Sequence, residues 1–178
     1  MLIEFIQGVL GDAKRRMDRA LQDLTADEIN WRPSPQANSI GFIVWHVTRV
    51  EDAWIGPWAQ EAQEVWERDD FAGRFNMPEV GHGIGLNEEQ IAAQPAFDAE
   101  ALRDYFDAVR AETLLFLSGL DDAALETVPG RLPFPELPGA GRFASYSLAR
   151  MFRQLSGEEQ AHLGQVAYVR GLQRGLDG

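Results

Sequence analysis

Three side chains in this sequence have the types and spacing that could bind a metal ion. Glu158 and His162 are four residues apart, so on one helix they lie one turn from each other, about 6 Å between Cβ atoms. Both fall where the surrounding apolar pattern predicts core residues, and His46 borders the apolar stripe of an earlier segment. Burying such groups without a partner would cost several kcal/mol. Two imidazoles and a carboxylate are one ligand set for a divalent ion.

The same pattern has a simpler explanation, and the spacing alone leaves both open. A core histidine that is hydrogen-bonded to a glutamate needs no metal ion. Two more residues bear on the site. His82, in the segment Gly81-His82-Gly83-Ile84-Gly85, belongs either to a lid loop or to a solvent-exposed loop. Glu159 could be an alternative ligand, although its position off the apolar stripe predicts a solvated side chain.

The elements that would position these residues are amphipathic helices, because apolar residues recur at steps of three and four in four long segments. We expect helices over about 2–24, from the capping residue Ser39 to about 56–57 or somewhat beyond, from the capping residue Asp98 to about 119, and from about Ser145 to about 172. Thr25 followed by Glu28 fits a capping box for one short turn after the first helix. The prolines that come next force a loop before the second helix.

These four segments, without β-alternation or an internal repeat, predict an all-α fold in a single domain, residues 1–178. The short first connection makes helices one and two antiparallel neighbours. The roughly 35 residues between helices two and three are enough to return the chain to its starting end. The prediction is therefore an up-down-down-up four-helix bundle with a long crossover between helices two and three.

Two segments resemble the signature helices of the DinB-like (YfiT-like) metalloenzyme superfamily. They are residues 38–52, NSIGFIVWHVTRVED, and residues 159–170, EQAHLGQVAYVR. Residues 24–33, LTADEINWRP, and the crossover from Trp66 to Gly85 are also similar to members of this family. The resemblance covers nearly the whole chain and implies an up-down-down-up four-helix bundle that is commonly dimeric.

The resemblance also implies a divalent ion, held in the family by one histidine from helix two and two from helix four. His46 matches the first and His162 the last, whereas the middle ligand falls on Glu158. A carboxylate reduces the net charge of the site and so favours harder metals, leaving Zn, Ni, Mn or Fe as candidates. The same substitution would equally fit a protein that has lost the ion and kept a Glu158–His162 hydrogen bond.

The functional expectation is a metal-dependent enzyme of the DinB-like class, such as a thiol-dependent S-transferase or a hydrolase. The family includes thiol-dependent S-transferases and an isomerase that uses a low-molecular-weight thiol. Because this chain has no cysteine, such a thiol would be an external cosubstrate. The alternative is a metal-free dimeric helical bundle that binds a small molecule or a partner protein.

The composition indicates which classes of binding partner to expect. With 16 Lys and Arg against 28 Asp and Glu, the net charge is −12, which disfavours nucleic acid and anionic membranes. No apolar run reaches the roughly 18 residues of a membrane span, and neither cysteines nor a signal-like N-terminus point to export, so we expect a cytoplasmic protein. Trp45 lies off the apolar stripe of its helix and predicts the contact surface of a homodimer.

Overall fold

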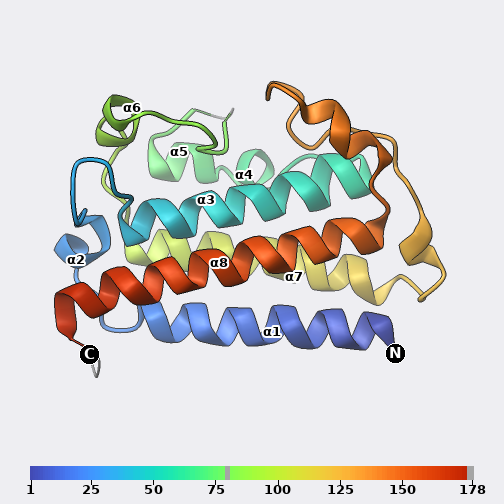
Figure 1. Cartoon of the computed structure of the whole chain (residues 1–178), viewed down its shortest axis with the longest axis horizontal. Coiled ribbons are helices and arrows are strands. Elements are labelled where there is room, and N and C mark those ends of the chain that lie inside the picture. The colour runs from blue at the N-terminus through green and yellow to red at the C-terminus, as the bar shows by residue number, and fades with distance from the viewer. Residues whose placement is uncertain (79–80, 176–178) are drawn as a thin grey trace.

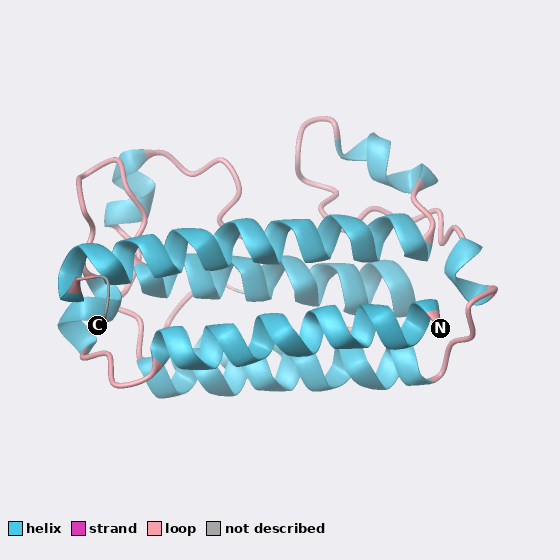
Figure 2. Cartoon of the chain, turned by 60° about the horizontal axis from the view of Figure 1, so that its bottom comes forward, coloured by secondary structure: helices cyan, strands magenta, loops and turns pink. Residues whose placement is uncertain are grey.

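The computed structural model describes residues 1–78 and 81–175, which fold into helices and turns without a strand. Four long helices lie side by side along the long axis (Figures 1 and 2). They are α1 (Leu2–Leu21), α3 (Ile40–Ala53), α7 (Ala99–Ser118) and α8 (Leu148–Arg174). α3 and α1 each pack against both α7 and α8. The all-α prediction is thus confirmed for this part of the chain, in which no helix is long and apolar enough to cross a bilayer.

Side-chain caps begin α3, α7 and α8 close to where the sequence predicts them. The Ser39 hydroxyl accepts a hydrogen bond from the Phe42 amide at 3.1 Å, and the Asp98 carboxylate accepts one from the Ala101 amide at 2.9 Å. Each cap satisfies an amide that has no partner within its own helix. α8 begins slightly later than expected, after Ser147 rather than at about Ser145.

The first connection explains why α1 ends at Leu21 rather than near residue 24. Gln22 is extended and Asp23 has a φ of 58°, so the helix cannot continue. A short helix, α2 (Ala26–Asn30), follows with the predicted capping box. In it the Thr25 amide donates to Glu28 at 2.8 Å, and the Glu28 amide donates to the Thr25 hydroxyl at 3.2 Å.

The long crossover between α3 and α7 consists of short helical pieces, of which the first continues α3 and the later ones lie along one side of it (Figure 1). They are a π-helical segment (Trp54–Gln60), α4 (Val65–Arg68), α5 (Phe71–Phe75) and α6 (Glu88–Ala92). The connection into α8 contains two 3₁₀ turns, Ala124–Glu126 and Ala140–Ser145. These two connections, rather than the long helices alone, enclose the candidate site described below.

The crossover buries the outer side of α3, which corrects the prediction for Trp45. Its side chain is only 4% exposed and packs against the rings of Trp66 and Phe97 at centroid distances of 6.2 and 6.1 Å. The periodicity of α3 could not show this, because the covering residues come from a segment without a regular pattern. A homodimer therefore remains a prediction, but its contact surface is not built on Trp45.

One buried side chain connects all four long helices. Arg110 on α7 is bound by both carboxylate oxygens of Glu51 on α3, with two N–O distances of 2.8 Å. It also donates to the carbonyl oxygen of Leu10 on α1 and to the carboxylate of Glu159 on α8. Thr113 donates to Glu51 at 2.6 Å. This polar cluster fixes the arrangement of the helices where they meet.

Candidate functional site

A cavity of about 330 Å³ opens beside the only α3 residue that is not buried, His46. The cavity lies between α3 and α8. It is also lined by residues 83–85 of the crossover and by Phe134, Leu137, Arg142 and Phe143 of the second connection. Glu158 and His162 line it from α8. The structure therefore places all three predicted site residues around one cavity.

The two histidine rings are neighbours in this cavity. Their centroids are 5.1 Å apart and their planes cross at 77°. His46 also stacks against Phe42, with a centroid distance of 6.1 Å and nearly parallel planes. Because α3 holds one ring and α8 the other, the packing of these two helices sets the distance between the imidazoles.

The surroundings of His46 fix its tautomer. Its Nδ1 lies 2.5 Å from the carbonyl oxygen of His82, and a carbonyl only accepts, so Nδ1 carries the hydrogen. Burial lowers the pKa of His46 to about 4, although the His82 carbonyl opposes this effect. His46 is thus neutral at neutral pH, with the lone pair on Nε2. A neutral imidazole held in this way has the protonation state that metal binding requires.

His82 is buried, which contradicts the expectation of a solvent-exposed loop histidine. Its ring nitrogens lie 3.1 Å from Glu136 and 3.3 Å from Glu64, and its side chain is 7% exposed. The loop that carries it does cover the site. Gly83 has a φ of 75°, and a Cβ there would lie 2.7 Å from the Trp45 ring, so the backbone approaches α3 as closely as only glycine allows.

His162 and Glu158 lie at the edge of the core rather than inside it. The His162 side chain is 16% exposed and that of Glu158 is 43% exposed, with 3.7 Å between His162 Nε2 and the nearer carboxylate oxygen. The Gln165 amide oxygen is 3.0 Å from His162 Nδ1, and Gln154 donates to Glu158 at 2.8 Å. With Nδ1 donating to Gln165, His162 also leaves Nε2 as the nitrogen with a lone pair.

The buried glutamate on this part of α8 is Glu159, so the expectation that Glu159 is solvated is wrong. It is 2% exposed and pairs with Arg110 in the cluster that connects the four helices. Burial raises the pKa of Glu159 to about 8, and the neighbouring Glu51 adds to this effect. Glu159 faces the core and Glu158 the cavity, because adjacent residues point about 100° apart on a helix.

The remaining cavity wall is largely aromatic. Trp54 comes from the π-helical segment, and Phe134 and Phe143 come from the second connection. These rings pack edge to face, with centroid distances of 5.8 Å from Trp54 to Phe134 and 5.2 Å from Trp54 to Phe143. Arg142 adds a guanidinium at the rim. The cavity thus combines an apolar wall with a few polar groups, as small-molecule sites do.

Several of these residues were not predicted from the sequence. Gln154 could have been found, because it precedes Glu158 by one helical turn on the same side of α8. The residues Phe134, Arg142 and Phe143 could not, since they lie in a segment with four prolines and no periodic pattern. Their positions depend on how that segment folds back over α3.

The donor atoms around the cavity fit a divalent ion in chemistry but not in arrangement. Two imidazoles and a carboxylate are suitable donors, and each histidine has its Nδ1 engaged by an oxygen, as metal-bound histidines do. Among residues 1–78 and 81–175, however, no three His, Cys, Asp or Glu side chains are close enough together to hold an ion. One oxygen of Glu158 accepts a hydrogen bond from Gln154.

The described part of the chain is thus an all-helical protein with a two-histidine cavity between α3 and α8. Residues 10–166 match the DinB superfamily, and the chain belongs to this family. The structure is also similar to a crystal structure described as the conserved protein of a locus from Enterococcus faecalis. The TM-score is 0.75, the sequence identity is 21%, and the match covers 95% of each chain. No functionally curated protein matches this sequence.

Proposed function

We propose that this protein is a metal-dependent enzyme of the DinB superfamily, with an up-down-down-up helical bundle and its reaction site in the His46–His162 cavity. In this proposal His46, His162 and Glu158 hold one divalent ion. The observation that supports it best is the pair of imidazoles from two helices, 5.1 Å apart, with both Nδ1 atoms occupied. Two histidines that only filled a cavity wall would not need matched tautomers.

A bound ion would supply Lewis acidity and lower the pKa of a coordinated water or thiol. The protein's own residues do the rest. The carbonyl of His82 and the amide of Gln165 orient the two imidazoles through their Nδ1 atoms. Trp54, Phe134 and Phe143 restrict the access of water and make room for an apolar part of the substrate.

The reaction class we favour is transfer or hydrolysis, with a low-molecular-weight thiol as the candidate cosubstrate. The cavity of about 330 Å³ is of the size that holds a small molecule. Arg142 at its rim gives an anionic group of such a substrate a charged partner. The chain contributes no thiol of its own, because it has no cysteine.

A metal-free binding protein is the second candidate, and one observation favours it. No preformed group of three metal-binding side chains exists among the residues that the structure describes. In that case the aromatic cavity binds a small molecule directly, and His46 and His162 serve as polar contacts. The homodimer remains part of both proposals, with a contact surface other than Trp45.

Elemental analysis and calorimetry separate the two candidates. We expect stoichiometric metal in protein purified without an affinity tag or chelator. In titrations with zinc and manganese, His46→Ala, His162→Ala and Glu158→Ala should each weaken binding by about tenfold or more, because each removes one of few ligands. Glu158→His should keep binding with a changed ion preference, since it restores a nitrogen donor. Glu89→Ala, on the exposed side of α6, is the matched control.

The outcomes are distinct. Unchanged binding in Glu158→Ala removes Glu158 from the ligand set but leaves the two histidines. Unchanged binding in both His46→Ala and His162→Ala ends the metalloenzyme proposal at this cavity. If the wild-type protein binds none of zinc, manganese, nickel or iron, the metal-free binding protein is the better description.

A further inference from the structure

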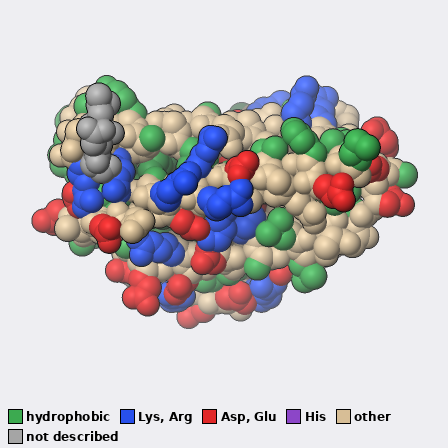
Figure 3. Space-filling view, turned by 90° about the horizontal axis from the view of Figure 1, so that it is seen from below, with side chains coloured by type: hydrophobic (Ala, Val, Ile, Leu, Met, Phe, Trp, Pro, Cys, Tyr) green, Lys and Arg blue, Asp and Glu red, His purple; other side chains and the backbone are tan. Residues whose placement is uncertain are grey.

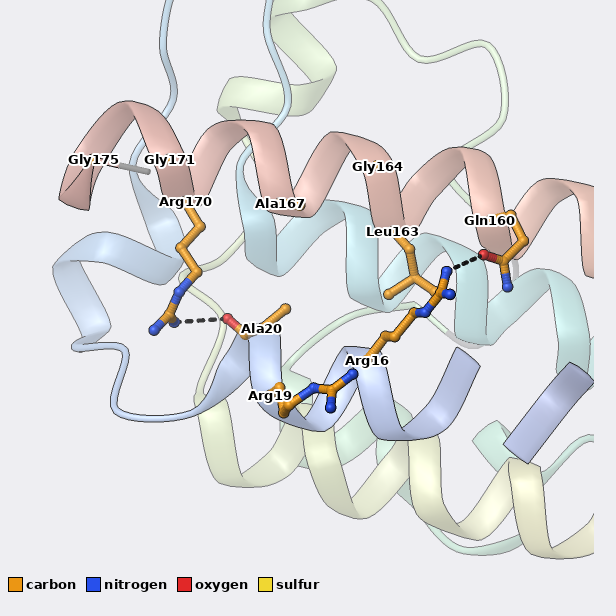
Figure 4. Close-up of a pocket in the computed structure, with 10 residues that line it drawn as sticks. All are labelled: Arg16, Arg19, Ala20, Gln160, Leu163, Gly164, Ala167, Arg170, Gly171 and Gly175. Carbon is orange, nitrogen blue, oxygen red and sulfur yellow. Dashed lines mark hydrogen bonds between the residues drawn. The ribbon is translucent and has the colours of Figure 1, made fainter. Parts of the chain in front are cut away.

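A second cavity, of about 510 Å³, lies between α1 and α8 and shares no lining residue with the histidine site (Figure 4). α1 contributes Arg16, Arg19 and Ala20 to it. α8 contributes Gln160, Leu163 and Arg170, together with the small residues Gly164, Ala167 and Gly171. We call this cavity the α1–α8 groove.

The charge of the groove is opposite to that of the protein. Among residues 1–78 and 81–175, its lining includes Arg16, Arg19 and Arg170 but neither an Asp nor a Glu, although acidic residues outnumber basic ones by 28 to 16 in the chain. Figure 3 shows Lys and Arg side chains gathered over part of this face, with Asp and Glu side chains beside them. Local positive charge in an acidic protein attracts anions specifically to this place.

Two of the arginines in the groove come from one side of α1. Arg16 and Arg19 are three residues apart on α1 and therefore lie on one side of that helix. Arg16 donates to the neutral amide oxygen of Gln160 at 3.0 Å, which ties its side chain across the groove to α8 (Figure 4). A guanidinium has five N–H donors, so this bond leaves Arg16 able to bind a carboxylate or a phosphate as well.

Arg170 closes the other end of the groove. It donates to the carbonyl oxygens of Ala20 and Gln22 at 2.9 and 3.0 Å. These carbonyls belong to the C-terminal end of α1, where the helix dipole is negative, so the charge of Arg170 is partly compensated there. The anionic group of a ligand is therefore expected nearer to Arg16 and Arg19.

The floor of the groove is apolar and open. Leu163, Ala20 and Ala167 supply aliphatic surface, and α8 has glycines at 164 and 171. A Cβ added at Gly164 would meet no atom within 4 Å, and the same holds at Gly171. Glycine weakens a helix interior by roughly 0.5–1 kcal/mol relative to alanine and fills no contact here. What these glycines do provide is volume.

We propose that the α1–α8 groove binds a small organic anion, in which a carboxylate or phosphate is joined to an apolar group. The anionic group lies between the guanidinium groups of Arg16 and Arg19, and the apolar part lies against Leu163 and Ala167. A long polyanion is a poorer fit, because the acidic surface beyond the groove repels it.

The test uses phenyl phosphate and octanoate as probes, measured by calorimetry and by amide chemical shifts of the full chain. Inorganic phosphate tests the apolar part of the proposal, and phenethylammonium, a cation, tests the charge. We expect both organic anions to bind with dissociation constants below about 1 mM and inorganic phosphate to bind about tenfold more weakly. The shifts should concentrate on α1 and α8, and the cation should not bind.

Two kinds of variant locate the site. Arg16→Gln with Arg19→Gln should weaken binding by about tenfold or more, because both charge-assisted bonds are lost. Gly164→Leu should abolish it by filling the groove, with a thermal midpoint no lower than that of the wild type. Gly157→Leu is the matched control, since Gly157 lies on α8 outside the groove and its Cβ would also meet no atom within 4 Å.

Three results would overturn the proposal. One is the failure of both organic anions to bind at concentrations up to about 10 mM. Another is binding that is unaffected by the double arginine substitution or by Gly164→Leu. The third is equal affinity for inorganic phosphate and phenyl phosphate, which would mean that the apolar floor takes no part. None of these results depends on metal binding at His46 and His162.

Discussion

Arg110→Met tests how the four long helices are held in one arrangement. Arg110 is 1% exposed and bonds to Glu51 on α3, Glu159 on α8 and the Leu10 carbonyl on α1. Methionine has a similar length and no charge, so it fills the space of the side chain without bonding to these oxygens. The carboxylate of Glu51, which is fully buried, would then have no cation beside it.

The size of the effect follows from which group stays charged. Because burial and Glu51 raise the pKa of Glu159 to about 8, Glu159 mostly holds a proton at neutral pH. The uncompensated charge left by Arg110→Met is then that of Glu51 alone. Removing one partner of a buried ion pair costs about 3–5 kcal/mol, a large share of the roughly 5–15 kcal/mol by which small proteins are stable.

Urea unfolding at neutral pH, followed by circular dichroism, measures this cost. Arg74→Met is the matched control, because Arg74 pairs with Asp104 at 2.7 Å but both side chains are half exposed. The control should change the free energy of unfolding by less than about 1 kcal/mol. Adding Glu51→Gln to Arg110→Met should return about half of the loss, since the amide carries no charge to bury and still accepts from Thr113.

A loss below about 1 kcal/mol in Arg110→Met would refute this reasoning, because it would mean that water or another group compensates Glu51. So would a failure of Glu51→Gln to restore any stability. In either case the buried cluster would not be what fixes the helices against one another.

Three shorter predictions concern other parts of the chain. Asp52→Asn should destabilise the protein by about 2–4 kcal/mol in urea unfolding, because Asp52 accepts from two backbone amides at 2.9 Å and an asparagine has only one oxygen to accept with. A loss of less than about 1 kcal/mol would contradict this. Gly83→Ala should lower the free energy of unfolding by about 1–3 kcal/mol, because the φ of 75° and the close contact with Trp45 strain an alanine, and nuclear magnetic resonance should show a changed His46 tautomer population. A stability and a spectrum like those of the wild type would contradict this prediction. Hydrogen bonds from Arg174 and Thr25 lower the pKa of Glu28 to about 2, so the stability that Glu28 contributes is present above pH 4.5 and is lost as the pH falls toward 2. A titration that gives the Glu28 carboxyl its ordinary pKa of 4.5 would contradict this.

The long helices could be predicted from the sequence because each has a local signal. Ser39 and Asp98 cap their helices as expected, and Thr25 and Glu28 form the expected capping box. Apolar steps of three and four indicate which side of each helix is buried. Such signals lie within a few residues of the element that they define, so one sequence is enough to find them.

The crossover could not be predicted in the same way. The sequence predicts Trp45 at the surface and leaves His82 in either a lid loop or an exposed loop, yet both side chains are buried by segments distant in sequence. Trp66 covers Trp45, and Glu64 and Glu136 bind the His82 ring. Contacts of this kind depend on how a segment without regular secondary structure packs against a helix, and the local sequence pattern does not predict them.

The two neighbouring acids on α8 show what separates a core position from a cavity position. After Leu155, a step of three leads to Glu158 and a step of four leads to Glu159, and an amphipathic helix allows either. The burial of Leu163 and Val166 selects the step of four, and Arg110 on α7 supplies a hydrogen-bond donor to the buried Glu159. Glu158 is thereby turned toward His162 and the cavity, half exposed and available to a ligand. The acid that stabilises the fold and the acid that can take part in chemistry therefore differ by one residue, and a charged partner on another helix decides which is which.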